Sequence, residues 1–481
     1  MVSLFLAIPE DVGAVSTRDT ILIDGNQEFT AENGVTGGSG TAVDPYIIEG
    51  WQIHPTANPG IHILRTTAYF VIRDVVIQSD SAWPDQGQSG IMLEHVSNFE
   101  IDSAEISNCP IGISVYLSAE GVIEGCNIHD TFMGIALSYS RAIMMQGNTL
   151  TSSIAKGIEL DSCDACAVLG NVMMYNSGLG IHYSRGTTVS GNVMTQNGIR
   201  ITGRSLIEFC SHTITTDNLV SGLPVYYYTG VTGIRLEGIQ AGEIILAGCS
   251  NVELVGLNIA ASTAGVEIAW STSVTLDSCV LQGNGNGLLL WFANAIDVQD
   301  CQFIGNRCGI GMYFSDRVNI VACQFSENTE YAVNMFRSSF IFVGESTFLS
   351  NWFAIYVQEC SRVTVSGNLI NGNAYGVNVY SCSKVSVLGN QIAYCAMSGW
   401  GTGLSIWDST KSVVILNDFI GNEINANAND AGGVLWDDGV SCGNYWDDYT
   451  GTDANNDLIG DTPYVIDADD QDNFPHMVPF N

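Results

Sequence analysis

The chain has 481 residues, with 15 Lys and Arg against 50 Asp and Glu, which gives a net charge of −35. A surface this acidic repels phosphate backbones and attracts cations, so we expect no nucleic-acid partner. Hydrophobic residues make up 46% of the chain, enough to fill a core, and this argues against disorder. One compact domain of this length is unusual, but a solenoid escapes the limit because its core grows along one axis.

The first residues resemble the end of a secretory signal peptide. An apolar stretch from Leu4 to Ile8 is followed by Val12-Gly13-Ala14, a Val-x-Ala cleavage pattern, but no basic residues precede it. We interpret residues 1–14 as a remnant signal-like segment that, if retained, could form a strand over the first coil, and residues 15–50 as an N-terminal cap. No apolar run reaches the roughly 18 residues of a transmembrane helix, so we expect no membrane insertion.

A repeat of about 22 residues runs through residues 51–420, with an interruption at 219–250. Residues 361–370 and 383–392 share the pattern small–basic–Val–polar–Val–x–Gly–Asn–x–Ile, so that Asn368 and Asn390 take the same place in successive copies. This Asn position recurs at a nearly constant step along the chain. It is occupied by Trp51, Val75, Ala104, Cys126, Asn148, Asn171, Asn192, Asn218, Leu257, Cys279, Cys301, Cys323, Ser346, Asn368, Asn390 and Asn417.

Within each repeat the apolar residues alternate with polar ones in three short runs, as at Val377 and Val379, then Val385 and Val387, then Ile392. Period-two alternation predicts strands, and so short a repeat leaves no room for a crossover helix. Such strands can only stack coil on coil as parallel sheets. The sequence therefore predicts an all-β fold, a right-handed parallel β-helix (solenoid) of roughly 17 coils, followed by an acidic C-terminal cap at residues 421–481.

The residues at the repeated Asn position have a structural explanation. Asn at a sharp corner tolerates the left-handed conformation, and its amide can bond the Asn of the next coil to form a ladder. Four Cys, at 126, 279, 301 and 323, occupy the same position. We expect them to face inward as buried free thiols rather than disulfides.

Two columns of aromatic residues are expected. One column has inward parity and should be a stacked core; it consists of Trp270, Phe292 and Phe314. The other should face outward, with Gln358 interrupting it; it consists of Trp291, Tyr313, Phe336 and Tyr380. An outward apolar strip usually marks a contact. Sugar rings could stack on it, a loop could cover it, or another copy of the chain could pack against it.

Three stretches resemble a known family. They are Ile23-Asp-Gly-Asn26 with residues 34–51, residues 222–228 with 241–252, and Gly443-Asn-Tyr-Trp-Asp-Asp-Tyr449 with Gly460-Asp-Thr-Pro-Tyr464. With the repeats, they resemble the NosD-like β-helix proteins of the carbohydrate-binding-and-sugar-hydrolase (CASH) type with PbH1 repeats, especially the archaeal secreted members. The resemblance implies a secreted or cell-surface β-helix.

The founding members of that family assist maturation of a copper site, but the residues here do not favour copper. The seven His, at 54, 62, 95, 129, 182, 212 and 476, include no close pair, and no Met or Cys–His cluster occurs. Copper is therefore expected to be absent. No paired carboxylates of a glycoside hydrolase are evident either, so catalytic residues remain unknown.

The strongest chemical motif lies near the C-terminus. Asp453, Asn455, Asp457 and Asp461 stand at positions 1, 3, 5 and 9 of a short loop, the alternation found in calcium loops. The loop departs from the EF-hand, because Leu458 replaces the turn Gly and Tyr464 stands where the bidentate Glu would be. We expect these four residues to bind calcium, the alternative being a turn with solvated acids.

Taken together, these features favour an extracellular or cell-surface β-helix with a binding or structural role. We expect glycan contact and a calcium-stabilised C-terminal cap. Two alternatives stay open: a polysaccharide lyase or glycoside hydrolase of the β-helix type, and a homo-oligomeric surface-layer or filament subunit that uses the aromatic strip as its interface.

Overall fold

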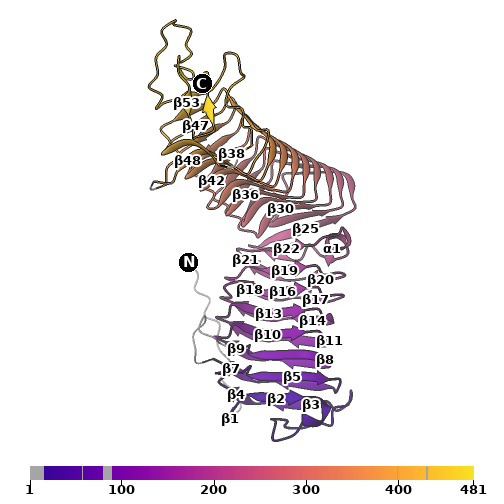
Figure 1. The fold of residues 1–481 in the computed structure, drawn as a ribbon. Helices are drawn as coiled ribbons and strands as arrows, with labels where there is room; N and C mark the ends of the chain where they lie inside the picture. The colour runs from indigo at the N-terminus through magenta and orange to yellow at the C-terminus, as the bar shows by residue number, and fades with distance from the viewer. Residues whose placement is uncertain (1–15, 57, 80–88, 398, 430–431, 481) are drawn as a thin grey trace, which may run out of the picture. The chain divides into compact units, whose positions relative to one another are not determined.

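The structure is a computed structural model that describes residues 16–56, 58–79, 89–397, 399–429 and 432–480. The signal-like segment 1–14 lies outside these residues. The chain divides into two compact units, Met1–Gly222 and Leu223–Asn481. In each unit, short parallel strands stack coil above coil along three faces (Figure 1).

Unit 1 contains sheets A, B and C. Sheet A consists of β1 (Ser16–Arg18), β4 (Trp51–Ile53), β7 (Val76–Gln78), β9 (Glu105–Ser107), β12 (Asn127–His129), β15 (Thr149–Thr151), β18 (Val172–Met174), β21 (Val193–Thr195) and β24 (Leu219–Val220). Sheet B consists of β2 (Ile21–Asp24), β5 (Ile61–Thr66), the first half of β8 (Ile91–Asp102), β10 (Ile111–Tyr116), β13 (Met133–Ser138), β16 (Ile158–Asp161), β19 (Leu179–His182) and β22 (Ile199–Thr202). Sheet C consists of β3 (Tyr46–Glu49), β6 (Phe70–Arg73), the second half of β8, β11 (Ala119–Glu124), β14 (Arg141–Gln146), β17 (Ala167–Leu169), β20 (Thr188–Ser190) and β23 (Thr213–Ile214). Two short helices, η1 (Asn26–Glu28) and α1 (Ile207–Cys210), complete the unit.

Unit 2 contains sheets D, E and F. Sheet D consists of β25 (Leu223–Thr229), β27 (Glu243–Ala247), β30 (Ala264–Ala269), β33 (Asn286–Trp291), β36 (Cys308–Tyr313), β39 (Tyr331–Phe336), β42 (Phe353–Gln358), β45 (Tyr375–Tyr380), β48 (Thr402–Trp407) and β51 (Ile424–Asn429). Sheet E consists of β26 (Thr232–Glu237), β28 (Ser250–Val255), β31 (Thr272–Asp277), β34 (Asn294–Gln299), β37 (Asp316–Val321), β40 (Ser339–Gly344), β43 (Ser361–Ser366), β46 (Ser383–Leu388) and β49 (Val413–Ile415). Sheet F consists of β29 (Asn258–Ala260), β32 (Val280–Gln282), β35 (Gln302–Ile304), β38 (Gln324–Ser326), β41 (Thr347–Leu349), β44 (Leu369–Asn371), β47 (Gln391–Ala393), β50 (Asp418–Ile420) and β52 (Tyr445–Trp446). An antiparallel pair, β53 (Tyr464–Val465) and β54 (Gln471–Asp472), follows.

The predicted fold class is confirmed: the chain is a right-handed parallel β-solenoid of about 17 turns with repeats of about 22 residues. In most strands alternate residues point inward and are buried, as Val377 and Val379 are in β45. The prediction of which aromatic residues stack in the core is wrong, however. Phe303, Phe325 and Phe348 of sheet F form it, with ring centroids 4.9 and 4.7 Å apart.

The column of Trp270, Phe292 and Phe314, expected in the core, instead stacks along a corner after sheet D. These residues have φ of 51°, 50° and 53°. A residue in the left-handed conformation turns the chain, so its side chain no longer follows the in–out alternation of the strand before it. The prediction that these side chains face inward was based on that alternation and is therefore wrong. Phe314 is 37% exposed.

The predicted Asn ladder is confirmed. In Asn148, Asn171 and Asn192 each side-chain amide donates to the carboxamide oxygen of the Asn one coil further along, at 2.8–3.0 Å. These Asn are fully buried. The left-handed conformation falls not on them but on the glycines before them, such as Gly147 and Gly170 with φ of 62°. The glycine thus forms the corner, and the side-chain amide of the Asn after it forms the hydrogen bond between successive coils.

The expected buried thiols are also confirmed. All fourteen Cys are free, and Cys126, Cys279, Cys301 and Cys323 are at most 1% exposed. Each takes the place of an Asn in the ladder; the Cys279 N–H, for example, donates to the sulfur of Cys301 at 3.3 Å.

Candidate functional site

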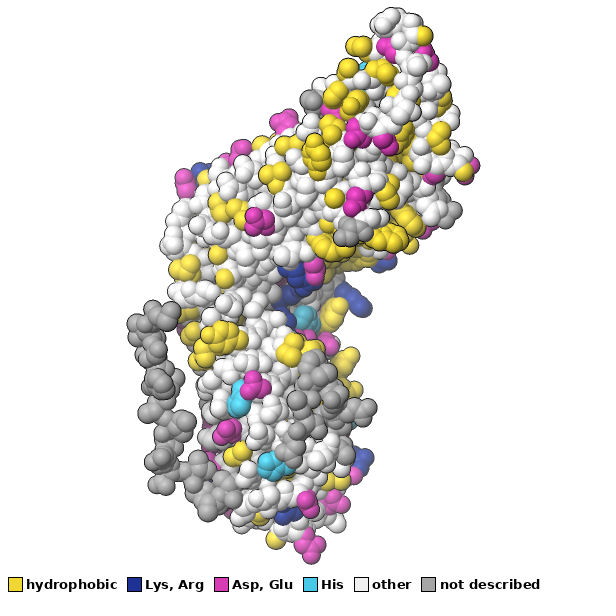
Figure 2. Space-filling model, turned by 90° about the vertical axis from the view of Figure 1, so that its left-hand side faces the viewer, with side chains coloured by type: hydrophobic (Ala, Val, Ile, Leu, Met, Phe, Trp, Pro, Cys, Tyr) yellow, Lys and Arg dark blue, Asp and Glu magenta, His cyan; other side chains and the backbone are white. Residues whose placement is uncertain are grey.

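The outward aromatic strip lies on sheet D, as expected from its register. Pairing of adjacent strands aligns its residues in one column, with the order Trp291, Tyr313, Phe336, Gln358, Tyr380 and Trp407. The rings of Trp291 and Tyr313 stack at 4.5 Å, whereas those of Tyr313 and Phe336 are tilted and 6.4 Å apart. In Figure 2, hydrophobic side chains gather in patches on the surface of unit 2, the upper part of the view.

A groove of about 460 Å³ opens at the C-terminal end of this strip. We call it the sheet D groove. It lies over β42, β45, β48 and β51, and it is lined by Phe353, Tyr356, Tyr375, Asn378, Val379, Tyr380, Trp400, Thr402, Ser405, Trp407, Ile424 and Asn427. Only Tyr380 belongs to the predicted strip. The strip and the groove therefore form a continuous aromatic face whose hollow part the sequence did not reveal.

Polar side chains run through the centre of the groove. Asn378, Ser405 and Asn427 are aligned on β45, β48 and β51, in the column next to Tyr380 and Trp407. Among the described residues, neither the Asn378 amide nitrogen nor the Asn427 amide oxygen has a hydrogen-bond partner, although both atoms are buried. An unpaired buried polar atom is costly, so these two atoms are candidates for hydrogen bonds to a ligand in the groove.

A carboxylate holds the loop that carries one wall of the groove. The loop precedes β48 and contains Trp400, which is 72% exposed. Glu423 accepts hydrogen bonds from the backbone N–H groups of Met397, Gly399 and Gly401, at 2.6–3.0 Å. These bonds, that from Gly399 foremost, lower the pKa of Glu423. The loop is thus tied to the start of β51.

The predicted calcium loop is compact. Asp453 accepts the backbone N–H groups of Asp457 and Leu458, at 3.2 and 2.9 Å, and the amide of Asn455 donates to Asp457 at 2.8 Å. Asp461 accepts the N–H of Ala454 at 2.8 Å and so ties the two ends of the loop. The structure therefore brings the four predicted side chains to one turn, where they also hold its backbone.

Another acidic cluster escaped the sequence analysis. Glu100, Asp102 and Glu124 lie on neighbouring strands of sheet C, and in the part of the chain that the structure describes they alone bring three acidic, His or Cys ligand atoms within 4.8 Å of one another. Burial and the charges of Glu124 and Asp102 raise the pKa of Glu100. The cluster forms because β8 pairs with β11 in a given register. That register could not be predicted from the sequence, because the repeats are weak near the N-terminus.

Comparison with known families gives two matches. Residues 216–451 match NosD, described as a periplasmic copper-binding protein, and residues 59–220 match the right-handed β-helix region. No curated protein matches the chain in sequence. In the described residues, no helix has the length and apolar character to cross a membrane.

Several solved structures are similar in fold. The A-module of mannuronan C-5 epimerase AlgE6 from Azotobacter vinelandii is 12% identical, with 81% of this chain and 82% of that one covered and a TM-score of 0.26. An alginate lyase from Paenibacillus sp. str. FPU-7 is 12% identical, with 59% and 99% covered and a TM-score of 0.31. PfbA, a surface adhesin of Streptococcus pneumoniae, is 10% identical, with 79% and 85% covered and a TM-score of 0.24.

The description of NosD as a copper-binding protein does not favour our expectation that copper is absent. Whether copper fits depends on the His and Cys side chains that the matched region offers as ligands. The matched region 216–451 contains no His. Its Cys residues are mostly buried in the core, and burial raises the pKa of Cys395 to about 12. A thiol held neutral is a poor copper ligand, because the metal binds the thiolate. The described residues of this region therefore lend no support to a copper site, whereas the match to NosD does not favour its absence.

The two matches fall on the two units in turn, and the parallel β-solenoid observed in each unit agrees with them. The chain has a right-handed parallel β-helix fold, and its residues 216–451 are similar to NosD.

Proposed function

We propose that the chain is a secreted or cell-surface protein that binds a glycan in the sheet D groove. The observation that carries this proposal is the combination of exposed aromatic rings with unpaired amide atoms in one hollow. Tyr380 and Trp407, 41% and 43% exposed, stand beside the column of Asn378 and Asn427. The volume of the groove, about 460 Å³, lies in the range of small-molecule sites.

The chemistry of a sugar suits this arrangement. A pyranose ring has an apolar C–H face that packs on an aromatic ring, while its hydroxyl groups both donate and accept hydrogen bonds. The Asn378 nitrogen would donate to one hydroxyl, and the Asn427 oxygen would accept from another. The aromatic column that continues toward Trp291 would extend the contact to further sugar units of a polymer.

The test is binding to a glycan array by the full chain and by Trp407→Ala, Asn378→Ala, Trp291→Ala and Tyr313→Ala variants. We expect Trp407→Ala and Asn378→Ala to reduce retention of the bound glycan about 10-fold or more. The variants at Trp291 and Tyr313 should weaken long glycans more than short ones. Tyr139→Ala is the matched control, because Tyr139 is 57% exposed on unit 1. Retention of no glycan, or equal retention by Trp407→Ala and the control, would refute the proposal.

The cap at residues 421–481 is part of the proposal. We infer that the loop from Asp453 to Asp461 takes up calcium and thereby stabilises the cap. Alternating carboxyl and amide side chains on one turn, in a segment without Lys or Arg after Lys411, support this.

A further inference from the structure

Three side chains on consecutive strands of sheet B form a hydrogen-bonded chain. On β19, His182 places its Nε2 atom 3.5 Å from the carboxylate of Glu159 on β16. The other ring nitrogen, Nδ1, is 2.5 Å from the hydroxyl of Thr202 on β22. In the tautomer that carries its proton on Nε2, facing the carboxylate, Nδ1 accepts the Thr202 hydroxyl proton. The result is a carboxylate–imidazole–hydroxyl relay.

The register of the strands explains how the three groups meet. His182 pairs directly with Thr202, whereas Glu159 pairs with Gly180 and Gly180 with Arg200. The ring of His182 leans back over Gly180 to reach Glu159. A Cβ at Gly180 would stand 2.8 Å from Nε2 of His182 and 3.0 Å from a carboxylate oxygen of Glu159. The absence of a side chain at Gly180 is therefore a condition of the contact.

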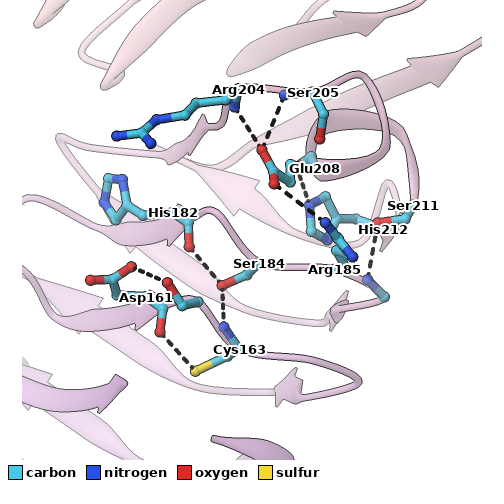
Figure 3. Close-up of polar contacts among 12 residues, drawn as sticks. Asp161, Cys163, His182, Ser184, Arg185, Arg204, Ser205, Glu208, Ser211 and His212 are labelled. Atoms are coloured by element: carbon cyan, nitrogen blue, oxygen red, sulfur yellow. Dashed lines mark hydrogen bonds and ion pairs between the residues drawn. The ribbon is translucent and has the colours of Figure 1, made fainter. Parts of the chain in front are cut away.

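The charges around the relay keep Glu159 ionised. Burial would raise its pKa, but the hydrogen bond with His182 and the charges of nearby cations, Lys156 and Arg200 among them, outweigh burial and lower it. The side chains of His182 and Glu159 are 20% and 27% exposed, so a reactant can approach from solvent. In Figure 3, His182 and Asp161 extend to the same side of their strands. On a neighbouring loop, the carboxylate of Glu208 accepts hydrogen bonds from the backbone N–H groups of Arg204 and Ser205.

We propose that Thr202 is a nucleophile for carboxylic esters, with His182 as its general base and Glu159 as the residue that positions the imidazole. The arrangement is analogous to the Ser–His–Asp/Glu relay that recurs on unrelated folds, with a threonine hydroxyl in place of the serine. Arg200 precedes Thr202 by two residues on the same strand and so faces the same side. Its positive charge acts on Glu159 of the relay.

The reaction is balanced with water as the second reactant. The Thr202 oxygen attacks the ester carbonyl carbon, the carbonyl π electrons move to the oxygen, and the hydroxyl proton passes to Nδ1 of His182. Collapse of the adduct breaks the bond to the alkoxy oxygen, and Nδ1 returns the proton to the leaving alcohol. Water then attacks the acyl-threonine by the same route, which releases the carboxylic acid and restores the hydroxyl.

A second His–Glu pair on the same sheet provides a comparison. His62 of β5 lies 3.0 Å from Glu94 of β8, again through Nε2. Within the described residues, however, no hydroxyl hydrogen bond to Nδ1 of His62 is formed. The Glu94–His62 pair is thus a surface ion pair on the same scaffold without a nucleophile.

The experiment uses a fluorophosphonate probe on the full chain, with the labelled peptide located by mass spectrometry. An activated hydroxyl attacks phosphorus and expels fluoride, so we expect a stable phosphonyl ester on Thr202. Hydrolysis of p-nitrophenyl acetate is measured in parallel. Thr202→Ala should abolish both signals, and Thr202→Ser should retain them. His182→Gln and Gly180→Ala should each lower the labelling rate about 100-fold or more.

The remaining variants separate positioning from folding. Glu159→Asp should keep part of the labelling that Glu159→Gln loses. His62→Gln, the matched control, should label as the parent does, and equal unfolding midpoints would show that the variants are folded. Labelling that is absent, that falls on another residue, or that Gly180→Ala leaves unchanged would overturn the proposal. Labelling of Thr202 and retention of a glycan are measured separately, so this result is independent of glycan binding.

Discussion

The backbone N–H of Asn444 donates to a carboxylate oxygen of Asp472 at 2.7 Å, and this bond ends the Asn ladder of unit 2. One coil earlier, the amide of Asn417 donates to Asn444 at 2.9 Å. Asp472 thus stands where the next ladder Asn would be, and it also accepts the indole N–H of Trp446 at 2.9 Å. The acidic cap is therefore joined to the solenoid through a fully buried carboxylate.

The first prediction concerns the pH dependence of this junction. Burial raises the pKa of Asp472. The folded protein then keeps the Asp472 proton to a higher pH than the unfolded chain does. The contribution of Asp472 to stability should fall as pH rises from about 3.9, the ordinary Asp value, to the raised pKa, and be level above it. Urea unfolding of the parent and of Asp472→Asn over this range measures the effect.

The difference between the two proteins isolates Asp472, because all other acids are common to both. The free energy of unfolding of the parent, minus that of Asp472→Asn, should decrease as pH rises through this range. Parallel curves for the two proteins would contradict the assignment.

A second prediction concerns another Asn ladder of unit 2, which runs parallel to the one that ends at Asp472. Asn306 donates to Asn328 and to the Leu281 carbonyl, and its own oxygen accepts from Asn284, at 2.9–3.1 Å. Asn306→Ala leaves these buried groups without partners and should lower the free energy of unfolding by about 2–3 kcal/mol. Asn258→Ala, at an exposed position, is the control and should change it by less than about 0.5 kcal/mol. Equal effects would show that the ladder adds nothing.

This ladder also marks a limit of the sequence analysis. The Asn position tracked from Ala104 to Asn417 was predicted because Val, Gly and Ile flank it in a constant pattern. The ladder through Asn284, Asn306, Asn328, Asn351 and Asn373 has the same spacing, but variable residues precede its Asn and hide it.

The groove was missed for a different reason. The step from Tyr380 to Trp407 is longer than the other steps of the column, because the loop containing Trp400 breaks the period just where the strip becomes hollow. The relay was missed because the strand register aligns Glu159 with Gly180 and not with His182. Only the side-chain volume absent at Gly180 brings them together. Fold and repeat can be read from periodicity, whereas a site depends on departures from it.

A third prediction concerns the loop that Glu423 holds. Glu423→Gln replaces a carboxylate that accepts three backbone N–H groups by a weaker neutral acceptor. Hydrogen exchange at Met397, Gly399 and Gly401 should become faster, and glycan affinity should fall with it. Glu327→Gln, also exposed, is the control.

The sign of the pH effect on this loop is opposite to that at Asp472. Because the folded pKa of Glu423 is lowered, its contribution is complete above the ordinary Glu value of about 4.3 and is lost as pH falls through the lowered pKa. Protection of the three amides that is insensitive to both acid and Glu423→Gln would show that other contacts hold the loop.

The last prediction concerns calcium. Calorimetric titration of calcium into chelator-treated protein should give binding heat that Asp453→Ala and Asp457→Ala abolish. The reason is that both carboxylates belong to one turn, where a cation would bind side-chain oxygens that otherwise accept backbone N–H groups. Asp437→Asn is the matched control: this acid also lies in the cap, but it is bound to Asn473. Heat that survives in both loop variants would move the site elsewhere, and the cluster of Glu100, Asp102 and Glu124 would be tested next, because calcium there would stabilise unit 1 instead of the cap.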